Sequence, residues 1–161
     1  MTTLFRPAHT LSSSSPIILY GAGNVGRELH TLLSRHGWKI HCFLDQNAQP
    51  GARWQSTPIY QPDATALTSH EHSYPVILSI FNRETNLVQI AQRLTQLGYG
   101  PCISFIDIYA DWASELSPRF WLAGRNYLQT HAEAIAAGQA SLSDVASRQL
   151  YAALLEFGRT G

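Results

Sequence analysis

The run IILYGAGNVGRELHTLLSRHGWKIHCFLD, residues 17–45, decides the fold of this chain. It opens on an apolar stretch that predicts a buried strand, and then places Gly21, Gly23 and Gly26 in the spacing G-x-G-x-x-G. An amphipathic helix follows, and a second apolar stretch ends on an acid, Asp45. This order of strand, glycine loop, helix, strand and acid is typical of a β-α-β unit that binds a nucleotide.

Each glycine of this run has a physical role. Gly21 permits a tight turn, Gly23 lets the backbone approach a phosphate, and Gly26 lets the helix pack closely on the strand. The helix dipole and the unpaired N–H groups of the first turn attract an anion. Asp45 lies 19 residues after Gly26, where a carboxylate accepts hydrogen bonds from ribose hydroxyls. The alternative for Asp45 is a turn residue at the end of a strand. The predicted binding residues of this run are Gly21, Ala22, Gly23, Asn24, Val25, Gly26 and Asp45.

A second loop is expected beside the first, because the carboxyl ends of parallel strands meet at one edge of a sheet. It contains Phe81, Asn82 and Arg83, where Arg83 could contact a diphosphate and Asn82 a base or sugar. The equally weighted alternative is that Asn82 caps the next helix and Arg83 is solvated. Arg27 could also face a phosphate. No arginine follows Asp45 closely enough to receive a 2′-phosphate, so an unphosphorylated ribose is preferred.

The remaining pattern alternates strands with helices and predicts an α/β fold, a small doubly wound and mostly parallel sheet (Rossmann-like) with a C-terminal two-helix extension. Expected strands are 17–20, 39–44, 75–80 and 102–106, with an extended piece at 57–60. Expected helices are 24–36, 63–67, 83–97, 126–137 and 141–157, the last starting with a capping box of Ser141 and Asp144. The expected divisions are a flexible arm (1–15), a nucleotide-binding domain (16–110), and an aromatic segment with a helical connector (111–161).

Composition excludes several classes of protein. Eleven basic residues balance eleven acidic ones, so no field recruits nucleic acid or an anionic membrane, and no apolar run is long enough to span a bilayer. Cys42 and Cys102, the two cysteines, lie in apolar strand-like runs and predict buried, inert thiols. The N-terminal residues lack a signal-peptide pattern, and a cytoplasmic location is therefore expected.

Motifs for catalysis are missing. Lys39 is the only lysine and opens a strand, so neither a Tyr-x-x-x-Lys pair nor a P-loop lysine is present. G-x-S-x-G does not occur. The run His70-Glu71-His72 is expected as an exposed turn, because no third or fourth metal ligand accompanies it. The sequence therefore predicts a chain that holds a nucleotide and has no catalytic or metal residues of its own.

Six runs together resemble the amino-terminal region of FkbM-type methyltransferases: ILYGAGNVGRE, FLDQNAQPGARWQSTPIY, VILSIFNRE, LGYGPCISFIDIY, PRFWLAGRNYL and SRQLYAALLEFGRTG. The resemblance covers the chain from about Pro16 onward. It implies an association with methyl transfer, with S-adenosylmethionine bound in a second domain that this chain does not contain. The chain would then be a fragment or an accessory module, with a downstream methyltransferase domain or subunit as partner. The first half is also similar to nucleotide-sugar-binding domains fused to sugar acyltransferases and epimerase-like enzymes.

Three functions remain open from the sequence. The first is a non-catalytic module that binds a small-molecule nucleotide, either NAD-like or a UDP-sugar. The second is a small NAD-dependent oxidoreductase or sugar-nucleotide enzyme, for which Tyr109, Asp107 and His131 are the candidate proton donors, in no recognisable arrangement. The third is a structural module whose terminal helices dock on another domain or subunit, a homo-oligomer included.

Overall fold

The computed structural model describes residues 4–82, 84–119, 122–124 and 126–160, with the backbone alone over 157–160. It divides into two compact units, 1–122 and 123–161. Among the described residues, no helix is both long and apolar enough to cross a membrane.

A six-stranded sheet organises the first unit, in the order β3-β4-β2-β1-β5-β6. All neighbouring strands are parallel except β3, which pairs antiparallel with β4. Their bounds are β1 Ile17–Tyr20, β2 Ile40–Leu44, β3 Arg53–Trp54, β4 Thr57–Tyr60, β5 Val76–Leu78 and β6 Cys102–Ser104. Strand β1 is central, with β2 on one side and β5 on the other, so the strand order reverses there.

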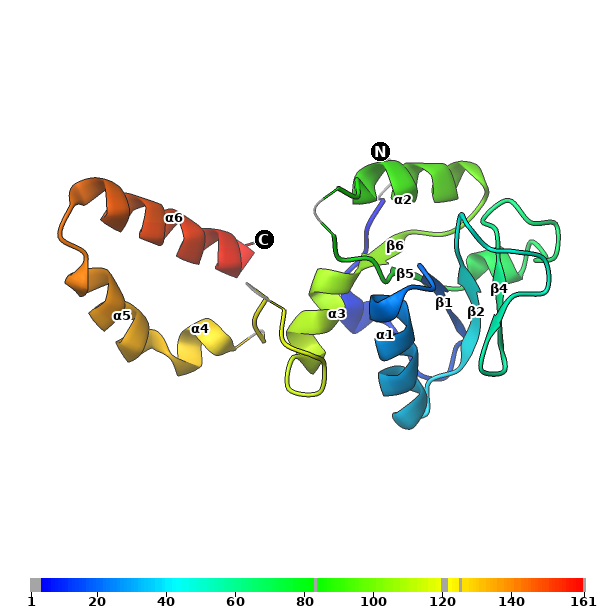
Figure 1. The fold of residues 1–161 in the computed structure, drawn as a ribbon, viewed down its shortest axis with the longest axis horizontal. Coiled ribbons are helices and arrows are strands. Elements are labelled where there is room, and N and C mark those ends of the chain that lie inside the picture. Colours follow the sequence, from blue (N-terminus) through cyan, green and yellow to red (C-terminus); the bar gives the residue numbers. More distant parts are fainter. Residues whose placement is uncertain (1–3, 83, 120–121, 125, 161) are drawn as a thin grey trace. The chain divides into compact units, whose positions relative to one another are not determined.

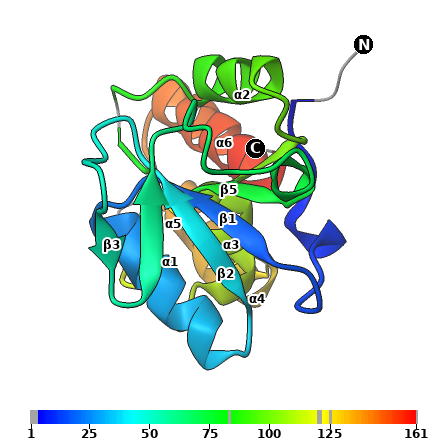
Figure 2. The same cartoon turned by 90° about the vertical axis from the view of Figure 1, so that its right-hand side faces the viewer.

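Helices cover both faces of this sheet (Figures 1 and 2). On one face α1 (Asn24–Arg35) and α3 (Phe105–Trp112) pack on the odd-numbered residues of β1, Ile17 and Leu19. On the other face α2 (Leu87–Gln96) packs on Ile18 and Tyr20. All four residues of β1 are buried, because a strand covered on both faces excludes water from both. The predicted α/β class, with a mostly parallel sheet and helices at the C-terminus, is confirmed.

Several predicted elements differ from the structure, among them the strand 75–80, of which 76–78 are strand, and the helix 126–137, which is two helices, 127–130 and 132–141. Helix α2 begins at Leu87 rather than at residue 83, because the side chain of Asn86 accepts the N–H of Gln89 and caps the helix there. The predicted strand 102–106 ends at Ser104, whose side chain accepts the N–H of Ile106 and starts α3. Residues 63–67 form turns and no helix, because so short a segment does not repay the cost of helix nucleation.

Part of the expected flexible arm lies against the sheet. The N–H of Arg6 donates to the carbonyl of Cys102 (2.9 Å), and the N–H of Cys102 donates to the carbonyl of Leu4 (2.8 Å). The short 3-10 helix Ala8–Thr10 follows, and the N–H of Ala8 donates to the carboxylate of Asp107 on α3. Backbone pairing along an open edge strand therefore holds residues 4–6, which polar composition alone does not reveal.

The second unit contains α4 (Tyr127–Thr130), α5 (Ala132–Ser141) and α6 (Val145–Thr160). Ser141 ends α5 and its hydroxyl donates to the carbonyl of Gly138, so the predicted capping box is wrong. Asp144 alone caps α6, where its carboxylate accepts the N–H of Ser147 (2.7 Å). None of the described side chains of this unit is buried.

Candidate functional site

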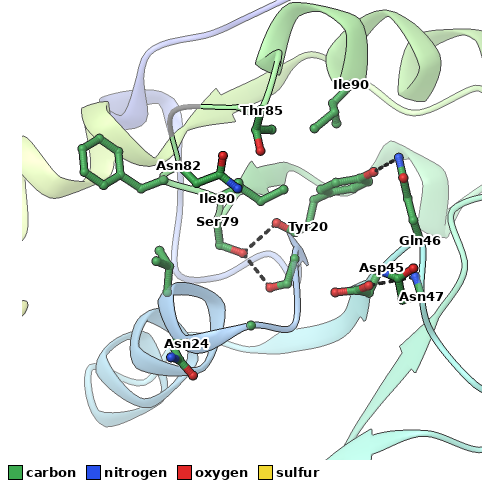
Figure 3. Close-up of a pocket in the computed structure, with 14 residues that line it drawn as sticks. Tyr20, Asn24, Asp45, Gln46, Asn47, Ser79, Ile80, Asn82, Thr85 and Ile90 are labelled. Atoms are coloured by element: carbon green, nitrogen blue, oxygen red, sulfur yellow. Dashed lines mark hydrogen bonds between the residues drawn. The ribbon is translucent and has the colours of Figure 1, made fainter.

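The carboxyl ends of β1, β2 and β5 meet around a pocket of about 400 Å³ (Figure 3). This is the place where the strand order reverses, the usual ligand position in an open α/β sheet. The residues that line it are Tyr20, Gly21, Gly23, Asn24, Val25, Asp45, Gln46, Asn47, Ser79, Ile80, Phe81, Asn82, Thr85 and Ile90. The structure therefore places most of the predicted binding residues around a single pocket, together with several that the sequence did not indicate.

The three glycines meet three different steric conditions. Gly21 has φ +103°, a backbone conformation that is strained for any residue with a side chain. A Cβ there would also lie only 2.9 Å from the side chain of Ile80. A Cβ on Gly26 would lie 1.9 Å from the carbonyl oxygen of Gly21, so only glycine lets α1 start this close to β1. A Cβ on Gly23 would meet nothing within 4 Å. Gly21 and Gly26 are thus required by the fold, whereas Gly23 borders open space.

The start of α1 presents backbone donors. Gly23 is the N-cap and provides no side-chain hydrogen bond, and the first helical bond runs from the N–H of Arg27 to the carbonyl of Gly23 (3.0 Å). The N–H groups of Asn24, Val25 and Gly26 precede that bond and have no carbonyl partner within the helix. Because Asn24 and Val25 line the pocket, this end of the helix dipole lies beside it.

Asp45 joins the glycine loop to the end of β2. Its Oδ2 accepts the N–H of Ala22 and its Oδ1 accepts the N–H of Asn47, each at 2.9 Å. A carboxylate offers about four acceptor positions. Two of them therefore remain on a side chain that lines the pocket.

Two polar side chains that the sequence did not indicate complete the inner wall. The hydroxyl of Ser79, which is 3% exposed, lies 2.8 Å from the carbonyl of Tyr20 and 3.1 Å from that of Gly21. The amide of Gln46 donates to the hydroxyl of Tyr20 (2.9 Å), and burial raises the pKa of this phenol. Both Ser79 and Tyr20 sit at or just beyond strand ends, which is the only signal the sequence gives for them.

The second predicted loop reaches the pocket in part. Phe81 and Asn82 line it, and Arg83 lies outside the described residues. The side-chain oxygen of Asn82 accepts the N–H of Glu84 (2.7 Å), which makes a local turn. The alternative in which Asn82 caps the next helix is wrong, because Asn86 is that cap.

Arg27 does not line the pocket. Its Nε donates to the carbonyl of Ala22 (2.8 Å), and its Cζ lies 4.3 Å from the centre of the Trp54 ring on β3. The guanidinium is thus engaged with the glycine loop and the β3–β4 hairpin, and the contact of Arg27 with a phosphate stays a prediction.

Of the described residues that line the pocket, Asp45 alone carries a charge at neutral pH. The candidate proton donors are not among the residues that line the pocket in the first unit. The hydroxyl of Tyr109 accepts the N–H of Arg119, Asp107 binds Ala8, and His131 belongs to the second unit. Within the described part of the chain, no three His, Cys, Asp or Glu side chains gather so as to hold a metal ion.

Comparison of the chain with protein-family models, curated proteins and solved structures found no match. The resemblance to FkbM-type methyltransferases therefore stays a prediction from the sequence, and the pocket has to be interpreted from its own chemistry.

Proposed function

We propose that the first unit is a binding module for a nucleotide. The phosphate lies against the first turn of α1 and the ribose hydroxyls bind Asp45. The observation that carries this proposal is the pairing, across one pocket, of unused helix N–H donors with a carboxylate that keeps two free acceptor positions. Gly23 supports it, because it lines the pocket and a Cβ there would meet nothing within 4 Å.

The ligand class is an NAD-like dinucleotide or a UDP-sugar with an unphosphorylated ribose. Asp45 would repel a 2′-phosphate, and no described cation lines the pocket to offset that repulsion. A pocket of about 400 Å³ accommodates a nucleoside diphosphate and leaves the rest of a larger ligand in solvent.

In this proposal the module binds without transforming its ligand. Both Asp45 oxygens already accept backbone N–H groups, so this carboxylate holds the glycine loop in place beside the pocket. By the resemblance, methyl transfer from S-adenosylmethionine belongs to another domain or subunit. The two buried free thiols, Cys42 and Cys102, support a cytoplasmic location.

Titration calorimetry with NAD, NADP, ADP, a UDP-sugar and S-adenosylmethionine tests the proposal. Binding of NAD or the UDP-sugar, with NADP at least tenfold weaker than NAD, is the expected result. Asp45→Asn provides the matched variant, because it keeps one acceptor oxygen for the backbone and loses the charge. No heat and no thermal stabilisation with any of these ligands at millimolar concentration would reject nucleotide binding.

A second candidate function, docking through the second unit, has its own observation. Leu150 and Leu154 of α6, four residues apart and so on one face of the helix, are 63% and 61% exposed. Neighbouring exposed apolar side chains commonly mark a protein contact. Sedimentation velocity of the wild type and of a Leu150→Glu, Leu154→Glu variant tests docking between copies of this chain. A wild-type protein that is monomeric at high concentration would exclude a homo-oligomer, and a downstream domain or subunit would remain as the partner of this candidate.

A further inference from the structure

In the glycine loop (residues 21–26), the backbone of Ala22 forms hydrogen bonds with two side chains from outside the loop. The N–H of Ala22 donates to Asp45 and its carbonyl accepts from the Nε of Arg27, at 2.9 and 2.8 Å. Because a trans peptide is planar, the carbonyl of Ala22 and the N–H of Gly23 point in opposite directions. A carbonyl fixed on Arg27 therefore also fixes the direction of the Gly23 N–H, and Gly23 lines the pocket.

Arg27 is itself held by the β3–β4 hairpin. Its guanidinium stacks over Trp54 of β3 at 4.3 Å, a contact that planar and delocalised charge favours. One turn further along α1, the Nε2 of His30 lies 2.8 Å from the hydroxyl of Thr57 on β4. Helix α1 thus contacts the hairpin at two successive turns of the same face.

We propose that Arg27 is a positioning residue, through which Trp54 on the hairpin holds the Ala22–Gly23 peptide in the orientation that binds a phosphate. The effect on affinity rests on the proposed function. The fixed orientation of the Ala22–Gly23 peptide, called the bracing of the loop below, does not. Direct contact between Arg27 and a phosphate is the competing explanation. It requires the guanidinium to leave both the Ala22 carbonyl and the Trp54 ring.

The two explanations differ in what Trp54 does. Arg27→Lys keeps the charge but loses the stacked, planar donor, and Trp54→Phe keeps an aromatic core side chain with a weaker attraction for a cation. Arg53→Lys is the matched control, since Arg53 lies on the same strand, is exposed, and donates within the turn to the carbonyl of Ser56.

The first measurement uses the ligand-free protein. We expect Arg27→Lys and Trp54→Phe each to shift the Gly23 amide resonance in a ¹⁵N–¹H spectrum and to speed its hydrogen exchange, with the double variant close to Arg27→Lys alone. Arg53→Lys should leave that resonance in place. An unmoved Gly23 resonance in Arg27→Lys overturns the inference, whether or not the protein binds a nucleotide.

The second measurement is the affinity of the ligand that the wild type binds best, at two salt concentrations. We expect a loss of roughly threefold to tenfold in each single variant, the size of one hydrogen bond, with the salt dependence of the wild type retained. An unchanged affinity in Trp54→Phe, together with a weaker salt dependence once Arg27 is replaced by Gln, would instead indicate direct phosphate contact. A wild type that binds no nucleotide overturns the proposed function and the affinity effect, while the Gly23 resonance still decides the bracing.

Discussion

Replacing Gly26 with alanine should destabilise the first unit, whereas the same change at Gly23 should not. The added Cβ at position 26 would lie 1.9 Å from the carbonyl oxygen of Gly21, far inside van der Waals contact. That oxygen cannot easily retreat, because it lies 3.1 Å from the buried hydroxyl of Ser79. Helix α1 would have to move by roughly 1 Å, and strain of this kind costs about 1–3 kcal/mol or more.

Alanine also favours a helix by about 1 kcal/mol over glycine, which offsets part of this strain. We therefore expect Gly26→Ala to lower the unfolding free energy by about 2 kcal/mol, or the melting temperature by roughly 4–8 °C for a chain of this size. Gly23 has φ −76° and ψ −169° with open space beside it. Gly23→Ala should change stability by less than about 1 kcal/mol, because the lower entropy of the unfolded chain favours alanine whereas alanine is a poorer N-cap than glycine.

The assay is urea denaturation followed by circular dichroism, with nucleotide affinity measured on both variants. Gly23→Ala should weaken the affinity although the fold is intact, because Gly23 lines the pocket and an added methyl group narrows the space beside the first turn of α1. Equal stability of the two variants would refute the steric assignment of Gly26. An unchanged affinity in Gly23→Ala would refute the phosphate position.

Three further predictions concern the neighbouring side chains. Ser79→Ala removes a buried hydroxyl that joins β5 to the end of β1, and should cost about 1 kcal/mol in urea denaturation. Asp45→Asn should weaken the binding of an unphosphorylated ribose roughly 10- to 100-fold, measured by calorimetry. Burial lowers the pKa of His30 from 6.5, so the neutral form stabilises the fold fully above that pH and loses this contribution as the pH falls. The difference in unfolding free energy between wild type and His30→Gln should then shrink by at most about 1.4 kcal/mol per pH unit below pH 6.5, and a pH-independent difference would contradict the buried position.

The spacing of glycines and the acid predicted the centre of the fold well. The distance from Gly26 to Asp45 is set by one helix and one strand of ordinary length, so Asp45 had to arrive beside the loop. The sequence also predicted β1, α1 and β4 with correct bounds or within a residue or two. These elements depend on the local spacing of apolar residues and on one β-α-β crossover, and the sequence pattern indicates both.

The errors lie at helix caps and at contacts between segments that are far apart in the chain. Phe105 continues an apolar run and predicts strand, but Ser104 before it has a hydroxyl that caps a helix. A cap and a strand end look alike in composition, and only the contact of Phe105 with the core decides between them. Likewise, nothing local to Arg27 shows that Trp54, in a loop-like stretch, lies under its guanidinium.

The two edges of the sheet are protected from pairing with other chains in different ways. This difference has a consequence for solubility. At one edge, β3 is two residues long and carries the exposed Arg53. At the other, residues 4–6 occupy the backbone groups of Cys102 in β6. Exposed edge strands template the pairing of one chain with another. A variant that lacks the residues before Ala8 would therefore present β6 as an open, apolar template, and would aggregate through strand addition even if the pocket at the ends of β1, β2 and β5 were intact.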